Sequence, residues 1–198
     1  MSESRYTPER IRSLHYKSAT ITLSPKYIAI VSEEIWRGTY FSRTGWCAHA
    51  PCDASALWIG ENFRKALESS EYFNKPGVPS LGRDEIRAME EASNTRRLAF
   101  WSEITQTYGY KDIDQAGRRC DVVLTSWHDL IEDFVTLIAT LRLPGGHRGW
   151  GPMEKKKYAE KRIAVPLSVS DEALGLAIRD ALSRCEASGR QKINTPSE

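Results

Sequence analysis

Two apolar runs on either side of a turn begin the regular pattern of the chain. Residues His15 to Leu23 are rich in β-branched side chains, Ser24-Pro25-Lys26 interrupts them, and Tyr27 to Val31 is apolar again. Strand-forming residues around a proline-containing turn predict a β-hairpin. A further stretch, Thr39 to Ala50, is rich in aromatic residues, so we predict a second extended region there.

Apolar residues at spacings of three and four predict helices in the middle of the chain. Between Ser55 and Ser70 this spacing places on one helix face the residues Ala56, Ile59, Phe63, Ala66 and Leu67. The segment Asn74 to Gly82 contains two prolines and two glycines, which predicts a surface loop. Asp84 to Tyr108 then has a helical pattern, as one helix or as two pieces.

The second half repeats this order of extended and helical segments. After the polar stretch Gly109 to Arg119, the runs Val122 to Trp127 and Phe134 to Leu143 predict two strands. We expect exposed loop from His147 to Pro152, continuing through the basic run Lys155 to Lys157. Ile163-Ala-Val-Pro166 predicts a short strand that leads into a C-terminal helix.

The chain resembles itself at an offset of 115 residues, without a gap. The first copy contains Pro51, Ser55, Ile59, Gly60, Phe63, Arg64, Ala66, Leu67 and Glu71. The second contains Pro166, Ser170, Leu174, Gly175, Ile178, Arg179, Ala181, Leu182 and Glu186. In each copy a strand ends at proline, a polar residue caps a helix, and an apolar stripe follows. The alternative is chance similarity between two amphipathic helices. We predict that both helices pack on one sheet, with Gly60 and Gly175 against it.

These elements together predict an α+β protein. A central, mostly antiparallel or mixed β-sheet is expected, flanked by helices and containing two similar strand-to-helix units. The length of 198 residues fits one domain, 1–198, and we expect flexible ends at 1–12 and 188–198. Hydrophobic residues make up 40% of the chain, which is enough to form a core.

Charge and cysteine content narrow the setting in which the protein acts. The net charge of +2 indicates no global attraction to nucleic acid or to a membrane surface. No apolar run approaches the roughly 20 residues of a membrane-spanning helix, and the N-terminus lacks a signal peptide, so we expect a cytoplasmic protein. Four scattered cysteines, at positions 47, 52, 120 and 185, are expected to be free thiols that pack as small hydrophobic residues.

Candidate catalytic and metal-binding groups are sparse. Cys47-Ala-His-Ala-Pro-Cys52 offers up to three zinc ligands through Cys47, His49 and Cys52, but no second ligand pair follows. His128 is considered as a general base toward Cys120 or Ser126, although no nucleophile signature surrounds either residue. Neither a catalytic residue nor a metal or other cofactor is therefore predicted.

The segment from Gly145 to Lys157 is the candidate for contact with phosphate or nucleic acid. Gly145-Gly-His-Arg-Gly-Trp-Gly151 lacks the Gly-Lys-Ser/Thr of a phosphate-binding loop. The lysines that follow Trp150 are consistent with nucleic-acid contact, but a run of this kind is more often a solvated surface. No direct binding of nucleic acid is expected.

A family resemblance lies in the C-terminal third. Gly149-Trp150 precedes the strand Ile163-Ala-Val-Pro166, which is followed by Ser168-Val-Ser-Asp-Glu-Ala-Leu-Gly175 and Ala177-Ile-Arg-Asp-Ala-Leu-Ser-Arg-Cys185. This arrangement, over Cys120 to Cys185, resembles the immunity proteins of contact-dependent growth inhibition, the CdiI type. The resemblance implies a small cytoplasmic α/β protein that binds and blocks the C-terminal toxin domain of an exported effector, which in such systems is often a nuclease.

We therefore expect a stoichiometric inhibitor, and not an enzyme, whose partner is the cognate toxin domain. The alternatives are a small enzyme that uses a His/Cys site and a nucleic-acid-binding accessory protein. Because binding hot spots are rich in Trp, Tyr and Arg, we place the partner contact in Glu33 to Trp46, with the loop Gly145 to Trp150 as its neighbour. The predicted contact residues are Glu33, Glu34, Trp36, Arg37, Tyr40, Arg43 and Trp150.

Overall fold

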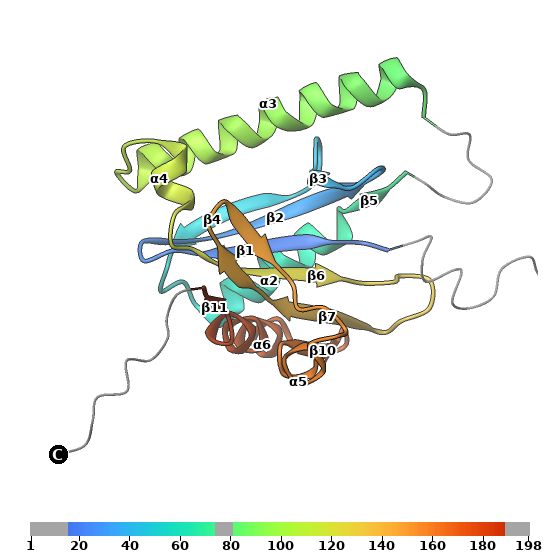
Figure 1. The fold of residues 1–198 in the computed structure, drawn as a ribbon, viewed down its shortest axis with the longest axis vertical. Helices are drawn as coiled ribbons and strands as arrows, with labels where there is room; N and C mark the ends of the chain where they lie inside the picture. Colours follow the sequence, from blue (N-terminus) through green and yellow to red (C-terminus); the bar gives the residue numbers. More distant parts are fainter. Residues whose placement is uncertain (1–15, 74–80, 189–198) are drawn as a thin grey trace, which may run out of the picture.

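A computed structural model of the chain describes residues 16–73 and 81–188 (Figure 1). The elements of its first half are β1 (Ala19–Leu23), β2 (Tyr27–Ile35), β3 (Thr39–Phe41), β4 (Cys47–Pro51), α2 (Ala56–Glu68), β5 (Glu71–Tyr72) and α3 (Arg83–Thr107). Those of the second half are α4 (Ile113–Gly117), β6 (Asp121–Ser126), β7 (Phe134–Ala139), β8 (Leu141–Leu143), β9 (Gly146–Arg148), α5 (Lys155–Glu160), β10 (Arg162–Pro166), α6 (Asp171–Ser183) and β11 (Glu186–Ala187).

A large, mostly antiparallel sheet organises these elements. Its strand order is β10-β7-β6-β1-β2-β3, and β4 pairs with the first half of β2 while β5 runs parallel to its end. Strands β11, β8 and β9 form a second, smaller sheet. The predicted α+β class, with a mostly antiparallel sheet flanked by helices, is confirmed. The predicted hairpin of β1 and β2 is also present, with Ile21 paired to Ile30.

Helices cover both faces of the sheet. Alternate residues of a strand point to opposite faces, and in β2 both sets are buried. Ile28 and Ile30 belong to a core shared with α2 and α6, whereas Tyr27, Ala29 and Val31 pack with residues of α3 and α4. Figure 1 shows α3 running along one side of the sheet, with α6 on the other side. The two-sided burial explains why this strand is an unbroken apolar run in the sequence.

The internal repeat predicted from the sequence corresponds to two equivalent strand-to-helix units. Strands β4 and β10 lie 115 residues apart and pair antiparallel to β2 and β7, respectively. Ser55 and Ser170 each cap the helix that follows, by accepting a hydrogen bond from the backbone N–H three residues later. The two units meet at the centre of the sheet, where β1 pairs antiparallel with β6.

The two glycines of the repeat lie between the helices and not against the sheet, so this part of the prediction is wrong. A Cβ atom on Gly60 would stand 1.8 Å from the carbonyl oxygen of Asp171 in α6. A Cβ atom on Gly175 would stand 1.8 Å from the carbonyl oxygen of Ala56 in α2. Each helix therefore packs its backbone directly on the glycine of the other. Both helices do pack on one sheet face, as predicted.

Two arginines of the repeat join the units reciprocally. Arg64 of α2 donates to Asp171 Oδ1 at 2.7 Å and to the carbonyl oxygens of Leu167 and Val169 at 2.9 and 3.0 Å. Its counterpart Arg179 donates to the carbonyl oxygens of Cys52, at 3.4 Å, and Ala54. Positions 52 and 54 are the repeat equivalents of 167 and 169. The exchange therefore has the form that a twofold rotation between the units produces.

Several predicted boundaries differ from the structure. The extended stretch 39–50 is two strands, β3 and β4, and the run 134–143 is divided between β7 in the large sheet and β8 in the small one. Residues 83–107 form one helix. Part of the predicted loop 147–152 belongs to strand β9, and the basic run lies in α5. Within the predicted loop 74–82, positions 74–80 are outside the described residues, as are the predicted flexible ends except Ser188.

None of the described helices combines the length and the apolar character that crossing a lipid bilayer requires.

Candidate partner-binding site

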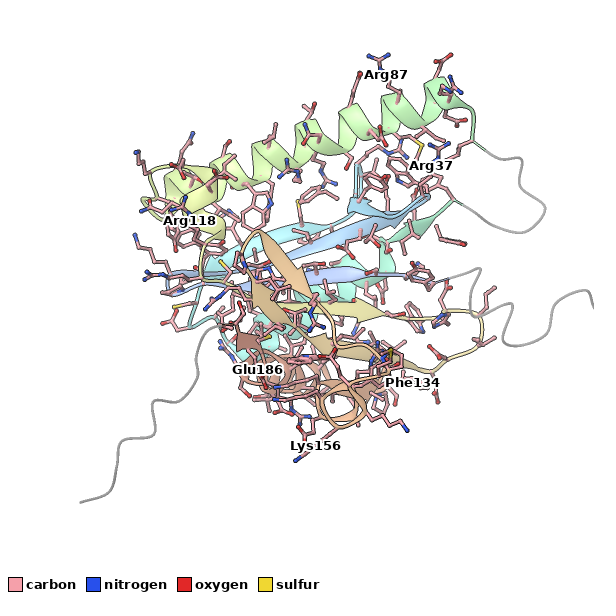
Figure 2. All side chains as sticks on the ribbon, in the orientation of Figure 1. Arg37, Arg87, Arg118, Phe134, Lys156 and Glu186 are labelled. Carbon is pink, nitrogen blue, oxygen red and sulfur yellow. The ribbon has the colours of Figure 1, made fainter. Side chains whose placement is uncertain are left out.

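The predicted contact segment lies where β2 ends and turns into β3. Trp36 and Gly38 form the turn, in which the N–H of Trp36 donates to the carbonyl oxygen of Gly38 at 3.2 Å. Figure 2 labels Arg37 at this end of β2, beside α3. Among the seven predicted contact residues Arg37 alone is exposed, whereas the others are partly or fully buried.

Glu33 is held inside a small polar cluster between strands. Its carboxyl oxygens lie 2.5 Å from Ser18 Oγ and 2.6 Å from Thr20 Oγ1, and Ser18 Oγ also lies 2.9 Å from the carbonyl oxygen of Thr125. Burial raises the pKa of Glu33, although the two hydroxyl groups act in the opposite direction. This carboxyl group therefore keeps its proton to a higher pH than an exposed glutamate. Its hydrogen bonds are made to side chains within the sheet.

Glu34 has a structural role in shaping the turn before β4. Its carboxylate accepts from Ser42 Oγ at 3.1 Å, from the N–H of Arg43 at 2.6 Å and from Arg43 Nε at 2.7 Å. The Arg43 guanidinium also lies over the ring of Phe73, 5.3 Å from its centroid. Glu34 is fully buried, and these bonds leave Arg43 with only an edge toward solvent.

Trp36 and Tyr40 stack on each other beneath α3. Their ring centroids are 3.6 Å apart and their planes are nearly parallel, at 8°. Trp36 is only 1% exposed and shares a small core with Ile86 and Met89 of α3. A partner could reach this indole only by separating the hairpin from α3. The exposed residues of the segment 33–46 are Arg37, Gly38, Thr39, Thr44 and Trp46, of which Trp46 is 42% exposed, and Tyr40 is partly exposed.

The segment around Trp150 lies away from the turn at Arg37, contrary to the prediction that the two are neighbours. Gly145 lies in a cleft with Arg118, and Figure 2 shows Arg118 and Arg37 at opposite ends of the sheet. Trp150 itself is 9% exposed, with Arg148 and Lys157 over its ring. The two predicted parts of the contact therefore do not form one patch.

The candidate catalytic and metal-binding groups are held in separate places. His49 contacts Tyr108 Oη at 3.1 Å and Glu103 Oε1 at 3.3 Å, whereas Cys52 Sγ lies 3.2 Å from the carbonyl oxygen of Pro25. Within residues 16–73 and 81–188 no group of three or more His, Cys, Asp or Glu side chains is placed to hold a metal ion.

The residues considered for a nucleophilic site are likewise not assembled into one. His128 Nδ1 lies 3.0 Å from Glu132 Oε2, and its ring packs on Tyr16. Cys120 is buried beneath Tyr27, and burial raises the pKa of its thiol, which keeps the sulfur protonated and unreactive. Lys157 of the basic run pairs with Glu186, as does Lys161 just after α5.

A cleft that the sequence analysis did not identify lies at the other end of β2. It has a volume of about 580 Å³ and is bounded by α3, by the end of α4 and by the β8–β9 hairpin. Four arginines line it, and we call it the arginine cleft: Arg97, Arg118, Arg119 and Arg142. These residues come from three segments that are 21 or more positions apart, so only the pair Arg118-Arg119 gave a local signal.

Comparisons with known proteins agree with this fold. The family model described as "CDI immunity protein", CdiI, matches residues 17–185. A solved structure of a protein of unknown function, NMB0488 from Neisseria meningitidis, is 14% identical with a TM-score of 0.69, over 87% of this chain and 97% of that chain. A CdiA-CT/CdiI toxin and immunity complex from Yersinia pseudotuberculosis contains a chain that is 18% identical, with a TM-score of 0.67, over 86% of this chain and 98% of that one. A search of curated proteins gives no significant match.

Proposed function

The chain belongs to the CDI immunity protein family, CdiI, and from this membership we propose that it binds its cognate CdiA-CT toxin domain and neutralises it. The observation that carries the proposal is the family match, which extends over residues 17–185 and so takes in nearly all of the described fold. Immunity proteins of this family are inhibitors, and a toxin-immunity complex has a component of the same fold.

We further propose that inhibition is by occupancy and that the protein acts in the cytoplasm. Supporting the first point, the side chains of His49, His128 and Cys52 each contact a different residue of the fold. A stoichiometric inhibitor needs no reactive group, because its effect comes from covering a surface of the toxin. Protection should therefore saturate at one immunity protein per toxin domain, and excess toxin should remain active.

Growth of bacteria that express the cognate CdiA-CT domain tests the function. We expect co-expression of this protein to restore growth and the two chains to co-purify in a fixed ratio, because neutralisation requires a stable complex. A CdiA-CT domain from a non-cognate system is the control and should still arrest growth. Continued arrest by the cognate domain in cells that contain folded protein would contradict the proposal.

The turn at the end of β2 is proposed as a peripheral contact with the toxin through Arg37, beside the edges of Tyr40 and Arg43. We expect Arg37→Ala to weaken binding by about 0.5 to 1 kcal/mol, mainly through slower association, because an exposed charge acts by steering more than by packing. Titration calorimetry and stopped-flow association measure the two effects. Arg87→Ala removes another exposed arginine, one that pairs with Glu91 on α3, and serves as the control. Equal affinities of the parent and the Arg37 variant would remove this turn from the interface.

A further inference from the structure

The arginine cleft contains arginine side chains that form few hydrogen bonds or ion pairs within the protein. Arg118 and Arg119 are exposed and, among the described residues, have no hydrogen bond or ion pair from their side chains. Arg97 donates a hydrogen bond to the neighbouring Asn94 side chain at 2.8 Å, and within residues 16–73 and 81–188 it forms no ion pair. Arg142 is 3.4 Å from the carbonyl oxygen of Cys120 and 4.0 Å from Asp121. The lining therefore contains four arginines and one acidic residue, Asp114, while Asp121 lies beside Arg142.

The backbone at Arg119, which lines the cleft, is strained. Its φ angle is +60°, and it is the one non-glycine residue with a positive φ in residues 16–73 and 81–188. Glycine would adopt this conformation without a steric penalty, as Gly109 does at φ +65°. Strained residues are typical of functional sites, where the side chain is needed more than local stability.

The remaining lining indicates a protein ligand. Beside the arginines it contains the indole of Trp101 and the aliphatic side chains of Ile113 and Leu143. Tryptophan and arginine around a partly apolar floor are the composition of protein-binding hot spots. Nucleic-acid surfaces instead follow a phosphate backbone with a basic groove, whereas the lining of this cleft includes the acidic residue Asp114.

The sign of the charge also restricts how the toxin is recognised. An inhibitor that covered a basic, nucleic-acid-binding groove would need an acidic surface, and this cleft has the opposite charge. Arginine forms bidentate hydrogen bonds with carboxylates, which gives both strength and orientation. Taking the proposed toxin-binding function as its basis, we propose that an acidic segment of the cognate CdiA-CT domain, with at least two carboxylates, binds in the arginine cleft.

The test compares two double charge reversals that change the net charge equally. Arg118→Glu/Arg119→Glu should weaken binding of the cognate CdiA-CT domain by at least about 100-fold, because attraction is replaced by repulsion. Lys155→Glu/Lys156→Glu, on exposed positions of α5, should leave the affinity within about threefold. Affinity of the parent protein should fall when NaCl is raised from about 50 to about 500 mM, because salt screens these charges.

A third variant separates a binding role from a structural one. Arg119→Gly relieves the strained backbone, so its thermal unfolding midpoint should not fall, yet it should bind the toxin at least about tenfold more weakly. Unchanged toxin affinity in this variant and in the double reversal would overturn the inference while the proposed function stands. A parent protein that does not bind the toxin would overturn both. Binding of a mixed-sequence RNA as tightly as the toxin, lost in the same variants, would overturn it in favour of a nucleic-acid site.

Discussion

Gly60→Ala and Gly175→Ala are each expected to lower the free energy of unfolding by about 4 kcal/mol or more. The added methyl group would meet a backbone carbonyl oxygen of the opposite helix at 1.8 Å. A side chain could rotate away from such a contact, but a carbonyl group moves only with its helix, so α2 and α6 must separate. Overpacking of this kind exceeds the roughly 1 kcal/mol that alanine gains in helix propensity. Urea unfolding monitored by circular dichroism measures the change.

The glycine variants have an internal control and an expected deviation from additivity. Gly117→Ala in α4 meets no atom within 4 Å, so it should be neutral or slightly stabilising. The double variant Gly60→Ala/Gly175→Ala should lose less than the sum of the single losses, because either methyl group already forces the same two helices apart. A loss below about 1 kcal/mol for either single variant would show that the helices do not pack this closely.

Leu67→Ala and Leu182→Ala are expected to destabilise the protein by similar amounts, about 2 to 5 kcal/mol each. The two leucines are repeat equivalents, one on each helix, and are only 1% and 3% exposed in the same core. Truncating either removes buried apolar surface and leaves a cavity beneath its helix. Denaturant unfolding of the two variants, with equal m-values required, provides the comparison.

Leu176→Ala is the matched control for this pair. Leu176 lies on α6 but is 58% exposed, so its truncation should change the stability by less than about 0.5 kcal/mol. If Leu182→Ala behaved like Leu176→Ala, the buried face of α6 would not be the one described. A large loss for only one of the two equivalent leucines would mean that the halves of the core differ in packing.

The strand-to-helix repeat could be predicted because its signals are local. Each unit has a proline at the strand end, a serine that caps the helix and an apolar stripe along it. These three signals lie within about 16 positions of one another. The neighbour of Gly60 could not be predicted, because a glycine in a helix indicates that another part of the chain packs closely there but not which part. Whether the neighbour is the sheet or a helix 115 positions away depends on the tertiary arrangement.

The two divided strands show that local sequence patterns do not predict where a strand ends. Residues 39–50 contain several strand-forming residues, but the chain turns at Ser42 to Gly45, where long-range bonds add to the local bond from the N–H of Gly45 to Ser42 Oγ. Arg96 of α3 donates to the carbonyl oxygens of Ser42 and Gly45, at 2.5 and 2.6 Å. Similarly, the run 134–143 breaks at Thr140, whose buried hydroxyl donates to the carbonyl oxygen of Val122 at 2.7 Å. Neither partner is near in the sequence.

The burial of the candidate contact residues could not be predicted, for a related reason. A cluster of Trp, Tyr and Arg satisfies the composition of a binding hot spot and also that of a stacked, buried hairpin, and Trp36 on Tyr40 is the second case. Composition does not separate the two, because both depend on large amphipathic side chains. The arginine cleft has the opposite property: it is visible only after α3, α4 and the β8–β9 hairpin have been brought together.

The reciprocal pairing of the two units has a consequence for the newly synthesised chain. In the central strand pair Ile21 lies opposite Val123, and the glycine face of α2 is covered by α6. At bacterial or eukaryotic elongation rates, the roughly 115 residues between the equivalent helices take about 6 to 23 seconds to make. During that interval the first unit leaves the ribosome with its sheet edge unpaired and its glycine-lined helix face uncovered. Such a topology folds slowly, because its decisive contacts close very long loops. Newly made protein therefore becomes effective only after the last helix has emerged.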